Sequence, residues 1–187
     1  MASTFTPLGI EKMATGENAG TWGTKTNANL DLAEQLLGGF KTVSIAGGAG
    51  TTTLTVVDGA LTGTAQARMI EFTGSITGNR IVTIPLDVEN FYIIKNATSG
   101  AYTVQFKYVS GSGDTFTFAT TNKGTAILFA TANDGTNPDI IQIQTGGDVV
   151  DDTSPQLGGD LDVNGNKIVS TSNGNIELEP NGTGDVI

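Results

Sequence analysis

The sequence predicts a mainly β fold: an antiparallel, jelly-roll-like β-sandwich with a short N-terminal helix and a C-terminal segment of β-repeats. The chain of 187 residues holds 29 Thr and 26 Gly, only 15% of it is charged, and apolar residues alternate along nine short segments. Thr favours the pleated surface of a strand, and Gly supplies the tight turns between strands. No helical pattern interrupts the nine segments, which excludes a doubly wound α/β sheet.

Residues 1–39 form the first of three predicted regions. Their first 25 positions are punctuated by Pro and Gly and are expected to form a loop. A helix of about three turns follows, with apolar residues at i, i+3 and i+7. A helix of this length has only marginal stability alone in water, and we therefore expect it to pack on a partner surface. Thr26 or Asn27 is the expected cap at the start of the helix. Leu30, Ala33 and Leu37 are its apolar residues, and Gly38 and Gly39 are expected to end it.

Residues 40–147 form the second predicted region, the β-sandwich. Nine runs alternate between apolar and polar side chains, and the turn clusters TGN, NATSG, SGSGD and NDGTNPD separate several of them. Short strands spaced at about 8–12 residues are typical of antiparallel sandwiches. The phenylalanines expected on the core face are Phe106, Phe116, Phe118 and Phe129.

Residues 148–187 form the third predicted region, an acidic linker and the start of a repetitive β-shaft. Eight acidic residues and a single Lys give this region −7 of the chain's net charge of −10. The segment LDVNG (161–165) recurs in related form as LEPNG (178–182), 17 positions further on. The few apolar residues cannot build a core within the region. Neighbouring chains are therefore expected to complete it, as in an intertwined trimer.

The composition argues against several functional classes. A net charge of −10 repels phosphate backbones and anionic lipid, so neither nucleic acid nor a membrane is an expected partner. The chain has no Cys and no His, which removes thiolate metal sites and the commonest general base. The start MASTFTPLG lacks the features of a signal peptide, so cytoplasmic synthesis is expected. We expect no enzymatic activity and no cofactor.

Two acidic patterns could hold a cation, but neither is predicted to do so. DLDVNG (160–165) begins like a calcium loop, yet Thr171 stands where that loop needs a bidentate Glu, so a β-turn is the expected structure. Asp148, Asp151 and Asp152 could meet on a three-fold axis, but a solvated linker is the favoured interpretation. No metal ligand is therefore predicted.

Three stretches carry a resemblance to a known family. GIEKMATGENAGTWGTKTNANLDLAE (9–34), RIVTIPLDVENFYIIKNATSGAYTVQF (80–106) and SPQLGGDLDVNGNKIVSTSNGNIELEPNGTGDVI (154–187) resemble, in this order, parts of tail-fibre and fibre-adaptor structural proteins of tailed bacteriophages. The likeness is to the marine cyanophage and pelagiphage type, and it extends over most of the chain. Such fibres usually run longer, so this chain is expected to be either a short adaptor or the proximal piece of a longer fibre.

The resemblance implies a function in the virion. It implies a homotrimer, made in the cytoplasm of an infected bacterium. It also implies an N-terminus attached to an adaptor, nozzle or baseplate protein of the tail. The trimeric shaft would project towards the host for adsorption, and a host surface glycan is a further partner that its distal parts could meet.

The first region holds the residues expected to dock onto the tail. Trp22, the single Trp, is a candidate anchor because aromatic side chains dominate interface energetics. Leu30 and Leu37 would add buried contacts, and Lys12 and Lys25 would belong to a polar rim. The alternative for Trp22 is that its ring packs against its own helix at Leu30 and Leu37.

A receptor-binding or carbohydrate-binding module is the rival function. Sugar sites present exposed aromatic rings, and Tyr92, Tyr102 and Tyr108 are the residues that could supply them. An enzyme is the third alternative. Most carboxylates of the second region fall in predicted turns, while Glu71 is expected on the polar face of a strand.

Overall fold

The computed structural model describes residues 2–120 and 123–143 and, further along, 161, 163, 165–170 and 174–177. The chain forms two compact units, Met1–Thr145 and Gly146–Ile187. The N-terminal residues and the strands thus share one unit, while the predicted region boundaries at 39/40 and 147/148 stay predictions. The acidic run, half of the calcium-like segment and most of the repeat lie outside the described residues.

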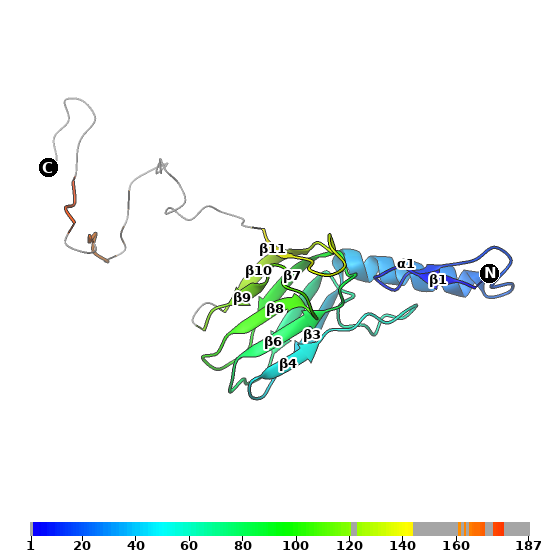
Figure 1. Cartoon of the computed structure of the whole chain (residues 1–187), viewed down its shortest axis with the longest axis horizontal. Coiled ribbons are helices and arrows are strands. Elements are labelled where there is room, and N and C mark those ends of the chain that lie inside the picture. The colour runs from blue at the N-terminus through cyan, green and yellow to red at the C-terminus, as the bar shows by residue number, and fades with distance from the viewer. Residues whose placement is uncertain are drawn as a thin grey trace, which may run out of the picture. The chain divides into compact units, whose positions relative to one another are not determined.

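One helix and eleven strands make up the described part of the first unit, which is mainly β as predicted (Figure 1). The N-terminal hairpin and the helix come first, and every longer strand follows them. In chain order the elements are β1 (Thr4–Phe5), β2 (Glu11–Lys12), α1 (Trp22–Gly38), β3 (Phe40–Ser44), β4 (Gly50–Thr53), β5 (Met69–Thr73), β6 (Arg80–Ile84), β7 (Asn90–Asn96), β8 (Val104–Tyr108), β9 (Phe116–Phe118), β10 (Thr125–Ala130) and β11 (Ile140–Gln142).

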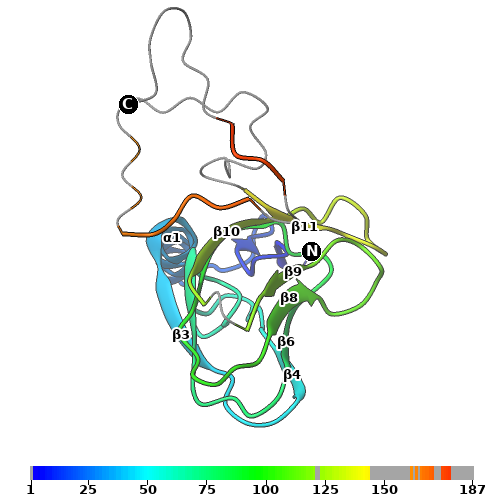
Figure 2. The same cartoon turned by 90° about the vertical axis from the view of Figure 1, so that its left-hand side faces the viewer.

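Two sheets face each other and enclose a single core (Figure 2). The strand order is β11-β10-β7-β5-β3 in one sheet and β4-β6-β8-β9 in the other. At the centre, Phe106 lies edge-on to Tyr92 with ring centroids 5.7 Å apart and tilts against Phe72 at 6.4 Å. All three rings are fully buried, so both sheets contribute to one packed interior.

The sheets are mixed, which corrects the prediction of an antiparallel sandwich. β3, β5 and β7 pair in parallel in one sheet, and β4, β6 and β8 pair in parallel in the other. The antiparallel pairs of these two sheets are β10 with β7, β10 with β11, and β8 with β9. The turn clusters TGN and NATSG explain the error, because each leads from one sheet into the other and is therefore a corner rather than a hairpin turn.

The chain makes three stacked passes between the sheets, a repeat that the sequence reasoning missed. The passes are β3–β4, β5–β6 and β7–β8, and their corners are joined by parallel bridges between Gly47 and Ile76 and between Ser75 and Ser99. Close stacking explains Gly100, whose φ is +101° and where a Cβ would lie 2.2 Å from the Ile76 carbonyl oxygen. The strand–corner–strand pattern at residues 40–53, 69–84 and 93–106 could have revealed the passes.

The helix is longer than predicted and begins earlier. It starts at Trp22 rather than near Thr26, although the N-cap residue Thr21 makes no side-chain capping hydrogen bond. Its end is as predicted: the Gly39 N–H donates to the Gln35 carbonyl, and a Cβ at Gly39 would lie 2.4 Å from that oxygen. Among the described residues, no helix is long and apolar enough to cross a bilayer.

The predicted facing is wrong in β10. Ala126, Leu128 and Ala130 point into the core, so Phe129, expected inside, lies on the outer surface of the sheet. Because side chains alternate along a strand, Ile127 is turned outward together with Phe129. The other three phenylalanines expected inside do pack in or against the core.

Candidate functional site

The helix is held by the N-terminal hairpin that lies beside it. The backbone N–H of Glu11 donates to Asn29 Oδ1 at 2.9 Å, and Asn29 Nδ2 donates to the Glu11 carbonyl at 2.8 Å. Lys25 Nζ lies 3.0 Å from the Glu11 carboxylate, and this hydrogen bond holds the pKa of the nearly buried Glu11 below its usual value. These tertiary contacts explain why the helix begins before the residues whose sequence suggests a cap.

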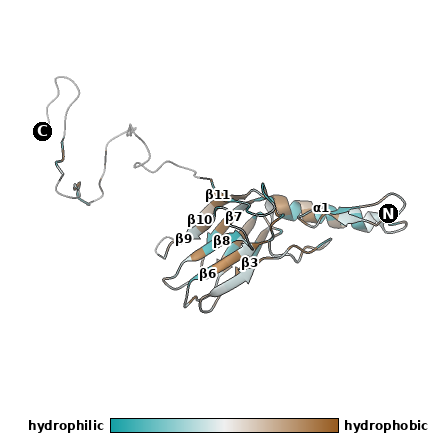
Figure 3. Ribbon diagram, viewed as in Figure 1, coloured by the Kyte–Doolittle hydropathy of each residue, from teal (hydrophilic) through white to brown (hydrophobic). Residues whose placement is uncertain are grey.

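The apolar side chains of α1 cover a wide arc of the helix surface, and only about half of that arc is buried on the side of the hairpin. Leu32 and Leu36 are buried, whereas Trp22, Leu30 and Leu37 are 63%, 63% and 73% exposed. At about 100° per residue, Leu30 and Leu37 lie within roughly 20° of each other on the helix surface. Figure 3 shows the resulting alternation of apolar and polar segments along α1. An exposed apolar stripe of this kind is typical of a protein contact surface.

The predicted docking residues therefore fall on one helix but differ in their surroundings. Trp22 is the first helical residue rather than part of a loop, and most of its ring is open, so it is not buried against Leu30 and Leu37. Lys25 already pairs with Glu11, whereas Lys12 is exposed on β2. The apolar members are thus accessible, and one of the two lysines is engaged within the chain.

Gln66 connects the N-terminal segment to the sandwich, and the sequence reasoning missed it. This side chain is fully buried; its Nε2 donates to the Leu8 carbonyl at 2.8 Å, and its Oε1 accepts from the Val57 N–H at 2.9 Å. Its backbone carbonyl accepts a hydrogen bond from the side chain of Gln35 in the helix. One residue thus joins the N-terminal segment, the helix and the sandwich. A lone amide between two alanines, in AQA (65–67), is the signal that could have drawn attention to it.

The tyrosines considered for sugar binding are mostly in the core, which corrects that suggestion. Tyr92 and Tyr108 are buried, and their hydroxyls donate to the carbonyls of Ala65 and Val88, both at 2.8 Å. Burial raises the pKa of both phenols, that of Tyr108 to about 12. Tyr102 remains partly exposed, and one ring does not make the shallow aromatic platform that a sugar site needs.

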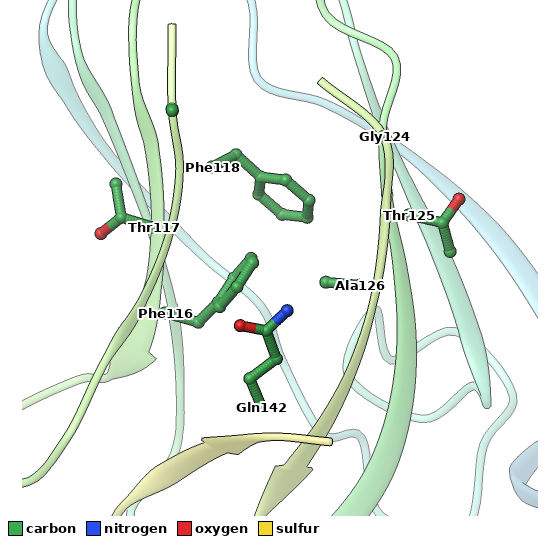
Figure 4. A pocket seen from close by; sticks show the side chains of 8 residues that line it. Phe116, Thr117, Phe118, Gly124, Thr125, Ala126 and Gln142 are labelled. Atoms are coloured by element: carbon green, nitrogen blue, oxygen red, sulfur yellow. The ribbon is translucent and has the colours of Figure 1, made fainter. Parts of the chain in front are cut away.

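A small pocket opens between β9 and β10, where the two sheets part (Figure 4). Its volume is about 250 Å³, and Phe116, Phe118, Ala126 and Gln142 point into it, whereas Thr117 points away. The two Phe rings meet edge to face at 4.8 Å. The lining holds no carboxylate, so it offers neither an acid–base pair nor a metal site.

The remaining carboxylates show no catalytic arrangement among the described residues. Glu71 lies on the outer face of β5, as expected, and pairs with Lys95 on β7 at 2.7 Å. No group of three or more acidic residues that could hold a metal is present in the part of the chain that the structure describes. No protein-family model matches this chain, and no curated protein or solved structure was found to be similar to it.

Proposed function

We propose that this chain is a structural component of a phage tail fibre, a homotrimer anchored to the tail through its N-terminus. The observation that carries the proposal is the exposed apolar stripe on a helix that the hairpin braces. Trp22 and Leu30 would enter apolar pockets of an adaptor, nozzle or baseplate protein, with Leu37 beside them and Lys12 at the rim. The chain itself would act mechanically, by joining the tail to the trimeric shaft to which the C-terminal repeat belongs.

Several features support a joint rather than a binding module for small molecules. The helix stays ordered through contacts made by backbone atoms and Glu11, so its apolar stripe is available without rearrangement. Preorganised surfaces lose less conformational entropy on binding. A glycan-binding role has less support, because two of its three candidate tyrosines are in the core.

Quantifying the fibre chain in purified virions tests the proposal. Trp22→Ala should weaken attachment by about 2 kcal/mol or more, the range of an aromatic hot spot. The melting temperature of the isolated chain should hardly change, since the ring is mostly exposed. Asn27→Ala, on a polar and exposed position of the same helix, is the matched control and should leave the copy number unchanged.

A point substitution is a sharper test than a truncation. Removing residues 1–25 would also delete Leu8 and Glu11, which hold the N-terminal segment to Gln66 and Asn29. Virions that carry the Trp22→Ala chain at the normal copy number, even after a high-salt wash, would show that the anchor lies elsewhere. Binding of the intact chain on a glycan array would instead favour the recognition module.

A further inference from the structure

The outer face of the five-stranded sheet carries a row of apolar side chains that crosses four strands and ends at the residue that follows β11. Ladder pairing places Phe40 beside Met69, Met69 beside Ile93, and Ile93 beside Ile127. The Ile143 N–H donates to the Ile127 carbonyl, which brings Ile143 next in line. None of these five side chains is buried, and Phe40 and Ile143 are 54% and 40% exposed.

A second, shorter row lies next to the first. Phe91 on β7 pairs with Phe129 on β10, and Phe129 pairs with Ile141 on β11, which is 48% exposed. Arg68 stacks over the Phe91 ring at 5.3 Å from its centroid. The two rows together make an apolar patch far larger than the single exposed residues that monomers commonly show. We call these eight residues the sheet patch: Phe40, Met69, Phe91, Ile93, Ile127, Phe129, Ile141 and Ile143.

The polar row that borders the sheet patch next to Ile93 and Ile127 is neutral. In the next row across the sheet, Thr42, Glu71, Lys95 and Thr125 lie side by side, and Glu71 and Lys95 form the 2.7 Å ion pair. Among the outward-facing positions of these five described strands, only that pair is charged. The chain as a whole carries −10, so copies of it repel one another over most of their surface. The strands of the sheet patch carry no net charge, and Arg68, Asp87 and Glu89 beside Phe91 and Phe129 sum to only −1, so copies can meet here with little of that repulsion.

The shape of the patch also suits contact with a like surface. Ile141 and Ile143 are exposed at one edge, while a hollow of about 550 Å³ lies where Leu8 and Ile10 meet Phe91 and Phe129; Arg68, Asp87 and Glu89 also line this hollow. A face that carries both exposed side chains and a hollow can form the head-to-tail contacts of a closed trimer, in which the exposed side chains of each copy meet the hollow of the next. The first residue of the patch, Phe40, is separated by Gly39 alone from the helix proposed to dock on the tail.

We infer that the sheet patch is the surface through which copies of this chain associate. The inference rests on the proposed function only for the expectation of a homo-oligomer; it separates the surface that binds copies, on the sheet, from the surface that binds the tail, on the helix. The self-association is side to side, with the apolar halves of five-stranded sheets packed against one another. The outer face of the four-stranded sheet stays in solvent.

The mass of the full chain in solution tests this assignment. By light scattering the wild type should exceed the monomer mass of 19.2 kDa. Ile127→Glu should raise the dissociation constant at least tenfold, because it puts a charge in the middle of the patch. Thr117→Glu, on the outer face of the four-stranded sheet, is the matched control and should leave the mass unchanged. A monomeric wild type, or an Ile127→Glu chain that keeps its mass, overturns the assignment.

Cross-linking tests the same assignment without placing a charged side chain in the sheet patch. The chain has no Cys, so Ile127→Cys and Thr117→Cys each introduce a single thiol. A short bis-maleimide should link Ile127→Cys chains into covalent dimers and leave Thr117→Cys chains as monomers. A thiol at position 127 that is protected from maleimide yet yields no dimer would mean that another part of the same chain covers the patch, which also overturns the assignment.

The helix offers the comparison that separates the two proposals. Leu30→Glu should leave the mass of the chain unchanged and abolish attachment to the tail. Dissociation of the oligomer by Leu30→Glu but not by Ile127→Glu would make the helix the surface for copies, against the present assignment. Loss of tail attachment alone, as with Trp22→Ala, bears on the proposed function and leaves the sheet patch untouched.

Discussion

The outer faces of the two sheets differ although both sheets cover the same core. Outward positions of the five-stranded sheet include Ile93, Ile127 and Phe129, whereas those of the four-stranded sheet include Gln105, Lys107 and Thr117. A two-layer fold needs only the inner face of each sheet to be apolar, and the four-stranded sheet follows that rule. Folding therefore does not require the apolar outer face of the five-stranded sheet, and contact with another molecule would account for it.

The largest expected effect on the free energy of unfolding comes from the core that both sheets cover. Phe106 is fully buried and contacts the rings of Tyr92 and Phe72, so Phe106→Ala should lower the free energy of unfolding by about 3–5 kcal/mol. Urea denaturation followed by circular dichroism measures the loss. Phe129→Ala is the matched comparison, and because that ring lies on the outer face, its cost in dilute solution should be clearly smaller. Equal costs would mean that Phe129 is buried in the folded chain even when it is monomeric.

The second effect concerns how firmly the N-terminal segment is tied to the sheets. Gln66→Ala removes the partners of the Leu8 carbonyl and the Val57 N–H, and it should cost about 1–3 kcal/mol, the range for leaving buried polar groups unsatisfied. Limited proteolysis should then cut within the first 20 residues sooner than in the wild type. Gln105→Ala, at the outer face of the four-stranded sheet, should stay within about 0.5 kcal/mol of the wild type. Unchanged proteolysis in Gln66→Ala would show that the helix alone anchors the segment.

The third prediction tests whether copies associate through the outer face of the five-stranded sheet. If copies associate through the sheet patch, the melting temperature should rise with protein concentration. For a trimer that dissociates as it unfolds, a tenfold rise adds about 2.7 kcal/mol per trimer, or about 0.9 kcal/mol per chain, which is roughly 2–4 °C for a chain of this size. The double variant Ile93→Thr/Ile127→Thr should remove this dependence and retain the fold. A melting temperature independent of concentration in the wild type would contradict self-association altogether.

The strands were predictable because their apolar residues repeat every second position, but their facing was not always so. In β5, Glu71 was correctly expected on the polar face of its strand, and its neighbours Ile70 and Phe72 are buried on the other face. In β10 the sequence TAILFA is apolar at both alternating sets of positions, so the pattern does not say which set faces the core. The alternation therefore predicts Phe129 on the wrong face, and the same ambiguity conceals the sheet patch.

Other features depend on contacts that a local pattern does not contain. Corners between sheets and hairpin turns use the same Gly, Asn and Thr residues, so the parallel pairing of β5 with β7 looked like antiparallel pairing. The start of the helix at Trp22 depends on Glu11, which is distant in sequence from Asn29 and Lys25. The apolar stripe itself was predictable, because Leu30 and Leu37 repeat at helical spacing.

The smallest expected effect concerns the neutral boundary between the apolar and polar halves of the five-stranded sheet. Lys95 is about half exposed, so solvent screens its pair with Glu71, and Glu71→Gln should cost only about 0.2–0.5 kcal/mol in the monomer. If the contact between copies ends at this row, as the position of the sheet patch implies, the cost should be equally small in the oligomer and should vanish in high salt. If the contact instead covers the pair, water is excluded from it, and removing one partner would leave Lys95 buried without a counter-charge at a cost of several kcal/mol.

Urea titrations of Glu71→Gln at low and high protein concentration distinguish these cases, with Glu71→Gln/Lys95→Met as the control that removes both charges. Similar costs at both concentrations confirm the boundary, whereas a cost that grows with concentration extends the interface over the polar half of the sheet.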